Sequence, residues 1–500
     1  MGRRIAAILM TMLLFAGCAQ QTDTQQNNME EPQESVSETD SQTEKEEKPL
    51  ILASGRHFFE HHPSRVQDAG QTVIPLVYEG LVSVGKDYHW EPRIAESIER
   101  TDSSYMITIR EDAAFSNGDT ISAWDVMRSM EIAMEEGSLW RSSLYSITDY
   151  TVMDTKKLRI VTESAGRDFE NLLTFPIAKQ ADSQWIGSGK YSFQSREGDT
   201  VLMGKNPYYR QPHDGPETIQ LKELPRMDAA DDSLRIGQIS CLFDDLTDGE
   251  AMNLSNRNQT VDINHIVFLG ANCVNGMASQ PRVRQAIHKA LDRQSLADRV
   301  YASKARPTDT PFNPIYYGIE EYTLSQPDLA EAQELMEKAE FTKNSTGYYE
   351  TEEYGSMTLL YNSENAYRHQ TAELIREQLE VAGIRIELQG VPYEEYMQLL
   401  QKGQFDLYLG ELAIGDNMDI SRLFTTGEGY GYGIGEQAAL LQFYTGWQQE
   451  RVELKLFMTK YLYELPAIPL LYREGIISFA PGVTVTVSPE PGNIFAGLAQ

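Results

Sequence analysis

The sequence predicts an α/β fold, and three observations support this. Beyond residue 262, short apolar strands alternate with segments whose apolar residues recur at helical spacing, which is typical of βαβ units and parallel strand pairs. Residues 105–110 alternate apolar and polar side chains and precede a turn and a helix start, so a strand–turn–helix unit is expected upstream as well. The 500 residues, 41% of them apolar, are sufficient for two or three packed domains.

The first 18 residues are typical of a secretory signal. Arg3 and Arg4 precede an apolar run at 5–15 that is too short to span a bilayer. The sequence Leu-Phe-Ala-Gly-Cys at 14–18 is similar to a lipobox, so we expect cleavage before Cys18 and acylation of its sulfur. An ordinary signal peptide with an incidental cysteine is the alternative.

Residues 19–48 are predicted to form a disordered acidic tether, because Gln, Thr, Ser and Glu dominate and almost no aliphatic residue is present to be buried. The whole chain carries 74 Asp and Glu against 43 Lys and Arg, a net charge of −31. Nucleic acid and anionic membrane surfaces are therefore poor partners, since both are polyanions. We interpret the acidity as supporting solubility outside the cell.

Ordered structure is expected to begin with a short apolar strand at 49–53. In the strand–turn–helix unit, Asn-Gly-Asp at 117–119 accepts the left-handed backbone that a tight reversal needs. Ser122 is the expected N-cap of the following helix, whose apolar residues recur at helical spacing from Val126 onwards. Residues 158–161 are predicted as a further strand.

The second half of the chain contains the alternating strands and helices. The predicted strands lie at 263–269, 357–361, 383–388, 405–410 and 467–472. The predicted helices lie at 281–293, 327–339 and 371–381.

Two short motifs suggest chemistry but lack its structural context. His57, Glu60 and His61 fit the spacing of an inverted zinc-peptidase motif, yet Pro63 follows at once and no helical periodicity surrounds them. The remaining alternatives are a metal or metal-chelate contact through His57 and His61, or an ordinary solvated loop, which we favour. Gly-Ser-Gly at 187–189 lacks the Lys and Ser/Thr pair of a phosphate-binding loop, so a chain reversal is expected there.

Beyond the predicted lipidation site at Cys18, the body of the mature chain would contain Cys241 and Cys273. A disulfide in an oxidising compartment and two buried thiols are both open, because sequence spacing does not distinguish them.

Longer motifs show a family resemblance. They are Tyr-Glu-Gly-Leu at 78–81, Glu-Pro-Arg-Ile-Ala-Glu-Ser at 91–97, the strand at 105–110 and the stretch from Phe115 to Val126 that contains the turn and the helix start. In this order and spacing they resemble the extracellular solute-binding proteins that serve peptide and nickel ABC importers, in particular the oligopeptide- and dipeptide-binding lipoproteins. Similar motifs recur along nearly the whole mature chain.

The resemblance implies a two-lobed periplasmic-binding-protein-like fold of type II, with an extra third domain and mixed sheets flanked by helices. Lobe I would comprise residues 49–80, 185–262 and 478–500. Residues 81–184 would form an accessory domain inserted in lobe I, and residues 263–477 would form lobe II. Such lobes close on a ligand by hinge motion.

The resemblance also implies a ligand site between the lobes. Gly-Asp-Asn at 415–417 is similar to a motif of dipeptide-binding members whose aspartate holds the peptide amino group, so Asp416 is the candidate for that role. Arg368 lies where such members carry an arginine for the peptide carboxylate, and His369 is its neighbour. The backbone at 410–414 is expected to pair with an extended ligand. The expected ligand-binding residues are Asp416, Arg368, His369, Gly410, Ala413, Tyr393, Trp140 and Tyr145.

These expectations describe a lipid-anchored protein of the cell membrane that faces the periplasm or the extracellular side. It would capture short peptides as a monomer and deliver them to the permease and ATPase subunits of an ABC importer, without cofactor, nucleic acid partner or enzymatic activity. The alternatives are the same fold binding nickel or another metal chelate, and a peptide sensor. A secreted peptidase is disfavoured, because no nucleophile-elbow Gly-x-Ser-x-Gly is present.

Overall fold

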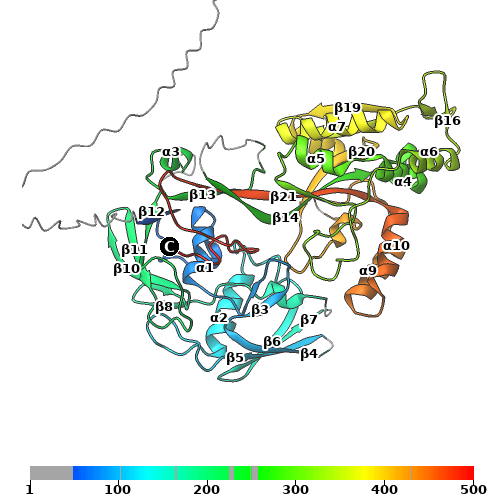
Figure 1. Ribbon diagram of the computed structural model, residues 1–500. Coiled ribbons are helices and arrows are strands. Elements are labelled where there is room, and N and C mark those ends of the chain that lie inside the picture. Colours follow the sequence, from blue (N-terminus) through cyan, green and yellow to red (C-terminus); the bar gives the residue numbers. More distant parts are fainter. Residues whose placement is uncertain are drawn as a thin grey trace, which may run out of the picture. The chain divides into compact units, whose positions relative to one another are not determined.

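The computed structural model describes residues 49–101, 103–163, 166–224, 230–247, 249, 257–427 and 429–500. The predicted signal peptide with Cys18 and the predicted tether lie outside the described residues. In the described part, helices and mixed sheets form an α/β fold, with larger sheets that each pack on an apolar core (Figure 1).

The first sheet has the strand order β1-β12-β11-β10, with β1 parallel to β12 and the other neighbours antiparallel. Its strands are β1 (Leu50–Ser54), β10 (Tyr191–Glu197), β11 (Thr200–Lys205) and β12 (Thr218–Glu223). The short helical segments near it are η1 (Pro63–Arg65), η2 (Ala69–Val73), α1 (Ile74–Val77) and α3 (Ala230–Arg235). The chain returns to this core at its end, where Ile494 and Phe495 are buried.

The second sheet has the order β4-β5-β7-β6 and is antiparallel throughout. Its strands are β4 (Ala95–Thr101), β5 (Ser104–Ile109), β6 (Ile147–Asp154) and β7 (Lys157–Thr162), and α2 (Ala123–Met134) packs on it. Short segments at its margin are β2 (Val82–Val84), β3 (Trp90–Pro92), η3 (Phe169–Leu172), β8 (Lys179–Ala181) and β9 (Gln184–Ile186).

The start of α2 confirms the helix predicted from Ser122. The Ser122 hydroxyl accepts a hydrogen bond from the Asp125 backbone N–H, and the Asp125 carboxylate accepts one from the Ser122 backbone N–H. This reciprocal capping box satisfies two backbone donors that the first helical turn leaves without partners. The strands predicted at 105–110 and 158–161 are confirmed as β5 and β7.

The third sheet is mixed. Its strands are β13 (Cys241–Asp244), β14 (Asn258–Ala271), β15 (Ala305–Pro307), β18 (Met357–Asn362), β19 (Ile386–Val391), β20 (Leu407–Ala413) and β21 (Ala467–Phe479). The parallel pairing predicted from alternating strands and helices is found between β18 and both β19 and β20. The strands β14 and β21 are antiparallel to their neighbours, which makes the sheet mixed.

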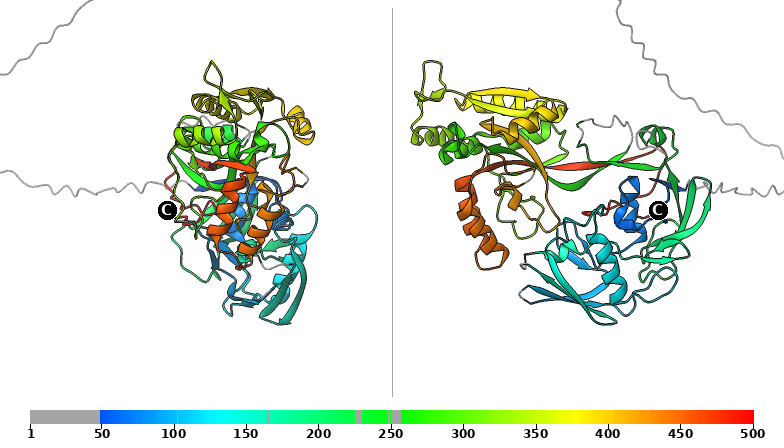
Figure 2. Two further views of the ribbon diagram at one scale, coloured as in Figure 1. Left: turned by 90° about the vertical axis from the view of Figure 1, so that its right-hand side faces the viewer. Right: turned by 180° about the vertical axis from the view of Figure 1, so that it is seen from behind.

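Helices and turns cover this third sheet. They are η5 (Met277–Ser279), α4 (Pro281–Ala290), α5 (Arg293–Arg299), α6 (Leu329–Lys338), α7 (Ala366–Val381), α8 (Tyr393–Gln401), η6 (Ser421–Leu423), α9 (Ala438–Gln448) and α10 (Leu454–Glu464). A small hairpin pairs β16 (Thr342–Lys343) with β17 (Tyr349–Glu350). Helices α9 and α10 lie against each other (Figure 2), with the rings of Trp447 and Phe457 stacked 6.0 Å apart.

Two predicted helix boundaries are wrong. The helix predicted at 281–293 ends at Ala290, because the Asp292 side chain accepts a hydrogen bond from the Ser295 backbone N–H and begins a new helix, α5. The helix predicted at 371–381 begins at Ala366, because Asn365 caps it by accepting from the Arg368 backbone N–H. Arg368 therefore lies in the first turn of α7.

The long strands β14 and β21 run side by side (Figure 1). Each contributes residues to two apolar cores. In β14, Val261 packs in the core of the first sheet, whereas Ile266 packs in that of the third. The ladder between the strands is irregular between Asp262 and His265, where Asn264 adopts a left-handed φ of 53°. The chain therefore passes from one core to the other through a bulged two-stranded ribbon.

Asp168 connects the second and third sheets through side-chain hydrogen bonds. Its carboxylate accepts the hydroxyl of Tyr316 at 2.5 Å and also that of Tyr317. Asp168 is buried and has a left-handed φ of 58°, a conformation that Asp adopts more readily than most residues.

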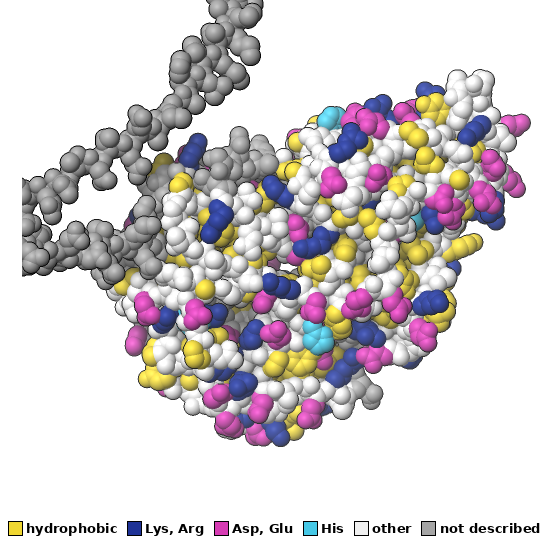
Figure 3. All heavy atoms as spheres, viewed as in Figure 1, with side chains coloured by type: hydrophobic (Ala, Val, Ile, Leu, Met, Phe, Trp, Pro, Cys, Tyr) yellow, Lys and Arg dark blue, Asp and Glu magenta, His cyan; other side chains and the backbone are white. Residues whose placement is uncertain are grey.

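The face seen in Figure 3 carries Lys and Arg side chains interspersed with Asp and Glu. Among the described residues, no helix combines the length and the apolar character that a bilayer crossing requires.

Candidate functional site

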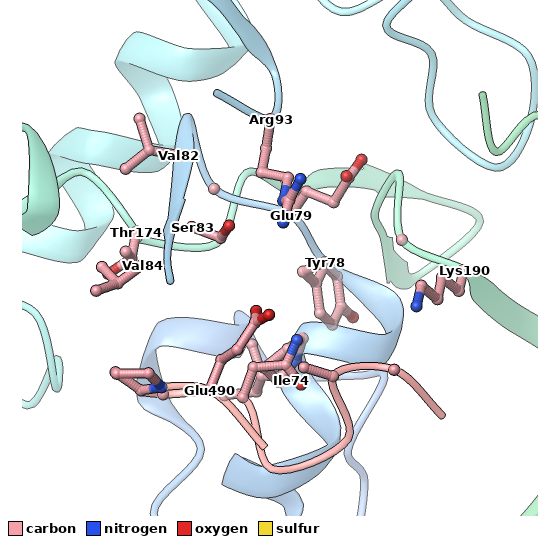
Figure 4. A pocket seen from close by; sticks show the side chains of 18 of the residues that line it. Ile74, Tyr78, Glu79, Val82, Ser83, Val84, Arg93, Thr174, Lys190 and Glu490 are labelled. Carbon is pink, nitrogen blue, oxygen red and sulfur yellow. The ribbon is translucent and has the colours of Figure 1, made fainter. Parts of the chain in front are cut away.

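A cavity of about 440 Å³, here called cavity A, lies among α1, the segment leading into β2 and β3, the turn before β10, and the C-terminal segment. Asp416, from the loop that follows β20, also lines it. Figure 4 shows Lys190 and Glu490 reaching into this space from different sides. The charged lining residues are Glu79, Arg93, Lys190, Asp416 and Glu490.

Among the described residues, none provides a cationic partner for the Asp416 carboxylate. No hydrogen bond or ion pair joins it to another side chain in the part of the chain that the structure describes, although its backbone carbonyl accepts from Asn171 Nδ2 at 2.8 Å. Burial, with a smaller effect from the Asp262 carboxylate, raises the pKa of Asp416 to about 6. The ionised form of a half-buried carboxylate without a cationic partner is stabilised when a cation enters the cavity.

The remaining charges of cavity A differ in how well they are paired. Glu79 is buried and accepts two hydrogen bonds from Arg210, at 2.7 and 2.9 Å. Within the described ranges, Lys190 and Glu490 have no side-chain hydrogen bond or ion pair. Burial lowers the pKa of Lys190 and raises the pKa of Glu490. Cavity A therefore offers unpaired groups of both signs.

A second cavity, cavity B, has a volume of about 350 Å³. It lies beside β20 and α8, and its walls are rich in aromatic rings: Phe268, Tyr393, Tyr396, Tyr408, Tyr430 and Tyr432. The segment at 410–416 passes from cavity B to cavity A, because Ala413 lines the one and Asp416 the other. Three residues of extended chain cover about 10 Å, so the two cavities are close neighbours.

A buried cluster of charges, here called the Glu411 network, lies at the wall of cavity B. Glu411 accepts hydrogen bonds from Nε and Nη2 of Arg473 at 3.0 and 2.7 Å, and its other oxygen accepts from Nη2 of Arg368. His265 Nδ1 lies 2.8 Å from Glu411 Oε1, and burial lowers the pKa of His265 to about 4, so the neutral ring donates this bond. Three of these donors share Oε1 and the fourth reaches Oε2, so the Glu411 carboxylate is compensated by two guanidinium groups and one ring N–H.

One edge of β20 is open beyond Tyr408. β18 pairs with β20 only at Leu407 and Tyr408, whereas β14 pairs with the other edge as far as Ala413. Among the described strands, none pairs with the open edge at 409–413. An extended chain could add there as a further strand.

The structure divides the predicted ligand residues among different places. Arg368, Gly410, Ala413 and Tyr393 line cavity B, and Asp416 and Trp140 line cavity A. His369 lines neither cavity and its Nδ1 lies 2.9 Å from the Tyr361 hydroxyl. Tyr145 also lines neither and is 76% exposed.

The other candidate groups have ordinary local roles. His57 Nδ1 lies 2.9 Å from Glu60 in an exposed pair, and no group of three or more His, Cys, Asp or Glu in the described ranges could hold a metal ion. Cys241 and Cys273 are free thiols. Burial raises the pKa of both.

Sequence reasoning missed Lys190 and Glu490 in cavity A, and Arg473 and His265 in the Glu411 network. The sequence could have identified Arg473, because it is a charged residue within an apolar stretch, and all thirteen residues of that strand are buried in the structure. Such a charge requires a buried partner. Lys190 and Glu490 had no comparable signal, since both lie in turns where charged residues are common.

Comparison with known proteins gives the family. Residues 89–431 match the family described as "Bacterial extracellular solute-binding proteins, family 5 Middle". The chain is similar to oligopeptide-binding protein AppA of Bacillus subtilis, with 23% identity over 378 residues that cover 68% of each chain.

Solved structures show the same fold. The MppA periplasmic murein tripeptide-binding protein, in an unliganded open form, superposes with a TM-score of 0.72 at 16% identity, covering 90% of this chain and 96% of that one. A nickel ABC transporter protein from Bacillus halodurans superposes with a TM-score of 0.71 at 17% identity, covering 90% and 99%. The predicted two-lobed α/β fold of type II is thereby confirmed.

Proposed function

Because this chain belongs to the bacterial extracellular solute-binding proteins of family 5, we propose that it captures short peptides at cavity A and delivers them to an ABC importer. The protein binds a solute and is not an enzyme. The names of two similar proteins, oligopeptide-binding AppA and murein tripeptide-binding MppA, support a peptide as the ligand.

The unpaired carboxylate of Asp416 carries the proposal. A peptide's free α-amino group is an ammonium at neutral pH, and it would supply the cation that Asp416 lacks. Burial disfavours the charged form of Asp416 and so raises its pKa, and a nearby ammonium would oppose that effect.

Capture by closure of the lobes is part of the proposal. The ribbon formed by β14 and β21 is bulged near Asn264, between the cores of the first and third sheets. Hinge motions are absorbed by a few residues at such positions. Closure would remove water from Asp416 and strengthen its interaction with the ligand.

Lipid anchoring also remains a proposal. It rests on the lipobox-like sequence that ends at Cys18, which lies outside the described residues. Metabolic labelling with a radioactive fatty acid should modify the wild-type protein, and Cys18→Ser should abolish the label. Equal labelling of both proteins would contradict the anchor.

Isothermal titration calorimetry with trialanine and N-acetyl-trialanine tests the peptide proposal. Trialanine should bind the wild-type protein, and both N-acetylation and Asp416→Asn should weaken binding at least tenfold, because each removes one member of the ion pair. Asp199→Asn is the matched control, since Asp199 pairs with Lys222 on the exposed surface. Binding of a nickel–histidine complex instead, unchanged in Asp416→Asn, would contradict the peptide proposal.

A further inference from the structure

The Glu411 network leaves Arg368 poorly suited to bind a ligand carboxylate. The side chains of Arg368, Glu411 and Arg473 are only 10%, 12% and 3% exposed. Glu411 already supplies the carboxylate that both guanidinium groups require, with four donors on its two oxygens. A ligand carboxylate at Arg368 would compete with Glu411 for this guanidinium group and would place a second anion beside the Glu411 carboxylate.

Cavity A contains a cation that is better placed. Lys190 directly precedes β10, and its backbone is held by hydrogen bonds on both sides: its carbonyl accepts from the Asn206 N–H at 2.8 Å, and the Gly189 N–H donates to the Val77 carbonyl at 2.9 Å. The side chain extends into the cavity (Figure 4). The nearby carboxylate of Glu79 forms its ion pair with Arg210 at 2.7 Å.

The charges around Lys190 match a zwitterion. Arg93, paired with Glu91 at 2.9 Å, and Lys190 are the cationic side chains that line cavity A. Asp416 and Glu490 line the same cavity as anions. A ligand that carries an ammonium at one end and a carboxylate at the other would therefore find opposite charges for both ends within one cavity.

The size of cavity A limits the ligand. A round cavity of 440 Å³ would be about 9 Å across, and an extended peptide advances about 3.3–3.6 Å per residue. A dipeptide or tripeptide spans about 7–10 Å on that basis, whereas a hexapeptide spans about 20 Å.

We propose that Lys190 binds the α-carboxylate of the ligand, so that both ends of a dipeptide or tripeptide lie in cavity A and Arg368 takes no part. This inference rests on the proposed function. It assigns the carboxylate-binding role to a residue of lobe I, and it makes chain length and a free C-terminus the determinants of specificity.

The test compares trialanine with trialanine amide by isothermal titration calorimetry on the full-length protein. In the wild-type protein, amidation should weaken binding at least tenfold, because it removes the charge that Lys190 binds. The Lys190→Met variant should bind trialanine at least tenfold more weakly than the wild-type protein does, and it should bind trialanine and trialanine amide with equal affinity. Lys222→Met is the control, since Lys222 forms an exposed pair with Asp199, and it should behave as the wild type does.

Three results would overturn the inference. Equal binding of acid and amide by the wild-type protein would show that no residue recognises the carboxylate, and this comparison needs no variant. Persistent discrimination in Lys190→Met would assign the role to another cation. Hexaalanine binding as tightly as trialanine would show that the two ends do not share cavity A. Each of these results would still leave the protein a peptide-binding protein. If neither trialanine nor its amide binds the wild-type protein or Lys222→Met, the proposed function itself is contradicted.

Discussion

Replacing Glu411 by alanine should destabilise the protein strongly without touching the apolar cores. The substitution removes the acceptor of four hydrogen bonds, three of them from two buried guanidinium groups. Each hydrogen bond to a charged group contributes about 1.5–3 kcal/mol, but the four are not additive because they share one carboxylate. Loss of one member of a buried ion pair costs about 3–5 kcal/mol, because the other charge stays buried without a partner.

We therefore expect Glu411→Ala to lower the free energy of unfolding by about 3–5 kcal/mol, the range for a broken buried pair. For a body the size of one lobe this corresponds to a fall in Tm of about 6–20 °C. Differential scanning calorimetry and urea denaturation followed by circular dichroism would measure the two quantities. The control is Glu395→Ala, because Glu395 is exposed on α8 and its loss should change stability by less than about 0.5 kcal/mol.

The same variant tests why Glu411 matters. Without Glu411, Arg368 and Arg473 should attract an anion from solution, so acetate should raise the Tm of Glu411→Ala more than that of the wild-type protein. A loss of stability below about 1 kcal/mol, the worth of an exposed ion pair, would refute the reasoning, because it would mean that the guanidinium groups become hydrated. An equal effect of acetate on both proteins would refute the anion-binding step.

Further predictions concern other parts of the molecule. The affinity for trialanine should fall about tenfold between pH 7 and pH 5, because Asp416, with a pKa of about 6, is mostly ionised at the first pH and mostly protonated at the second; calorimetry on Asp416→Asn should show no such change. Above pH 6, the unliganded Asp416→Asn protein should be more stable than the wild type by up to about 3 kcal/mol, because a carboxyl group whose pKa is raised by folding destabilises the folded state once it is ionised. Urea titrations should show that this difference vanishes below pH 4, where the carboxyl group is protonated in both the folded and the unfolded state. Asp168→Ala should lower the free energy of unfolding by about 2–4 kcal/mol, because the buried hydroxyl of Tyr316 and the partly buried hydroxyl of Tyr317 lose their acceptor, whereas Asp168→Asn, which keeps an acceptor, should lose less. Ser122→Ala should cost about 1 kcal/mol in urea denaturation through loss of the cap of α2, and no loss would mean that the capping box is not formed.

The sequence alone predicts those helices and strands whose formation depends on neighbouring residues. The alternation at 105–110 and the cap at Ser122 identify β5 and α2 because strand periodicity and capping depend on neighbouring residues. Helix boundaries are harder to predict, because a single capping side chain determines where a helix begins. Asn365 caps α7 and Asp292 caps α5, and both residue types are common N-caps. Apolar periodicity alone does not identify these two boundaries.

The site was harder to predict, because its residues meet across long stretches of chain. Arg368 was expected to be free for a ligand, yet its partner Glu411 lies 43 residues away, and Arg473 lies a further 62 residues along. No spacing rule connects residues at such separations. The sequence does show that Glu411 and Arg473 are charged residues within apolar strands. Two buried charges of opposite sign are candidates for a buried ion pair.

The strand β21 has a consequence for biosynthesis. It follows the other described strands in the sequence, yet Ile477 and Phe479 belong to the core of the first sheet while its earlier residues belong to that of the third. A nascent chain synthesised as far as residue 466 therefore leaves β13 and β14 with unpaired edges, which other unfolded chains could join. Pairing partners more than 200 residues apart also form slowly. Protection of these edges until residues 467–479 have been synthesised is thus a requirement that this topology places on the cell.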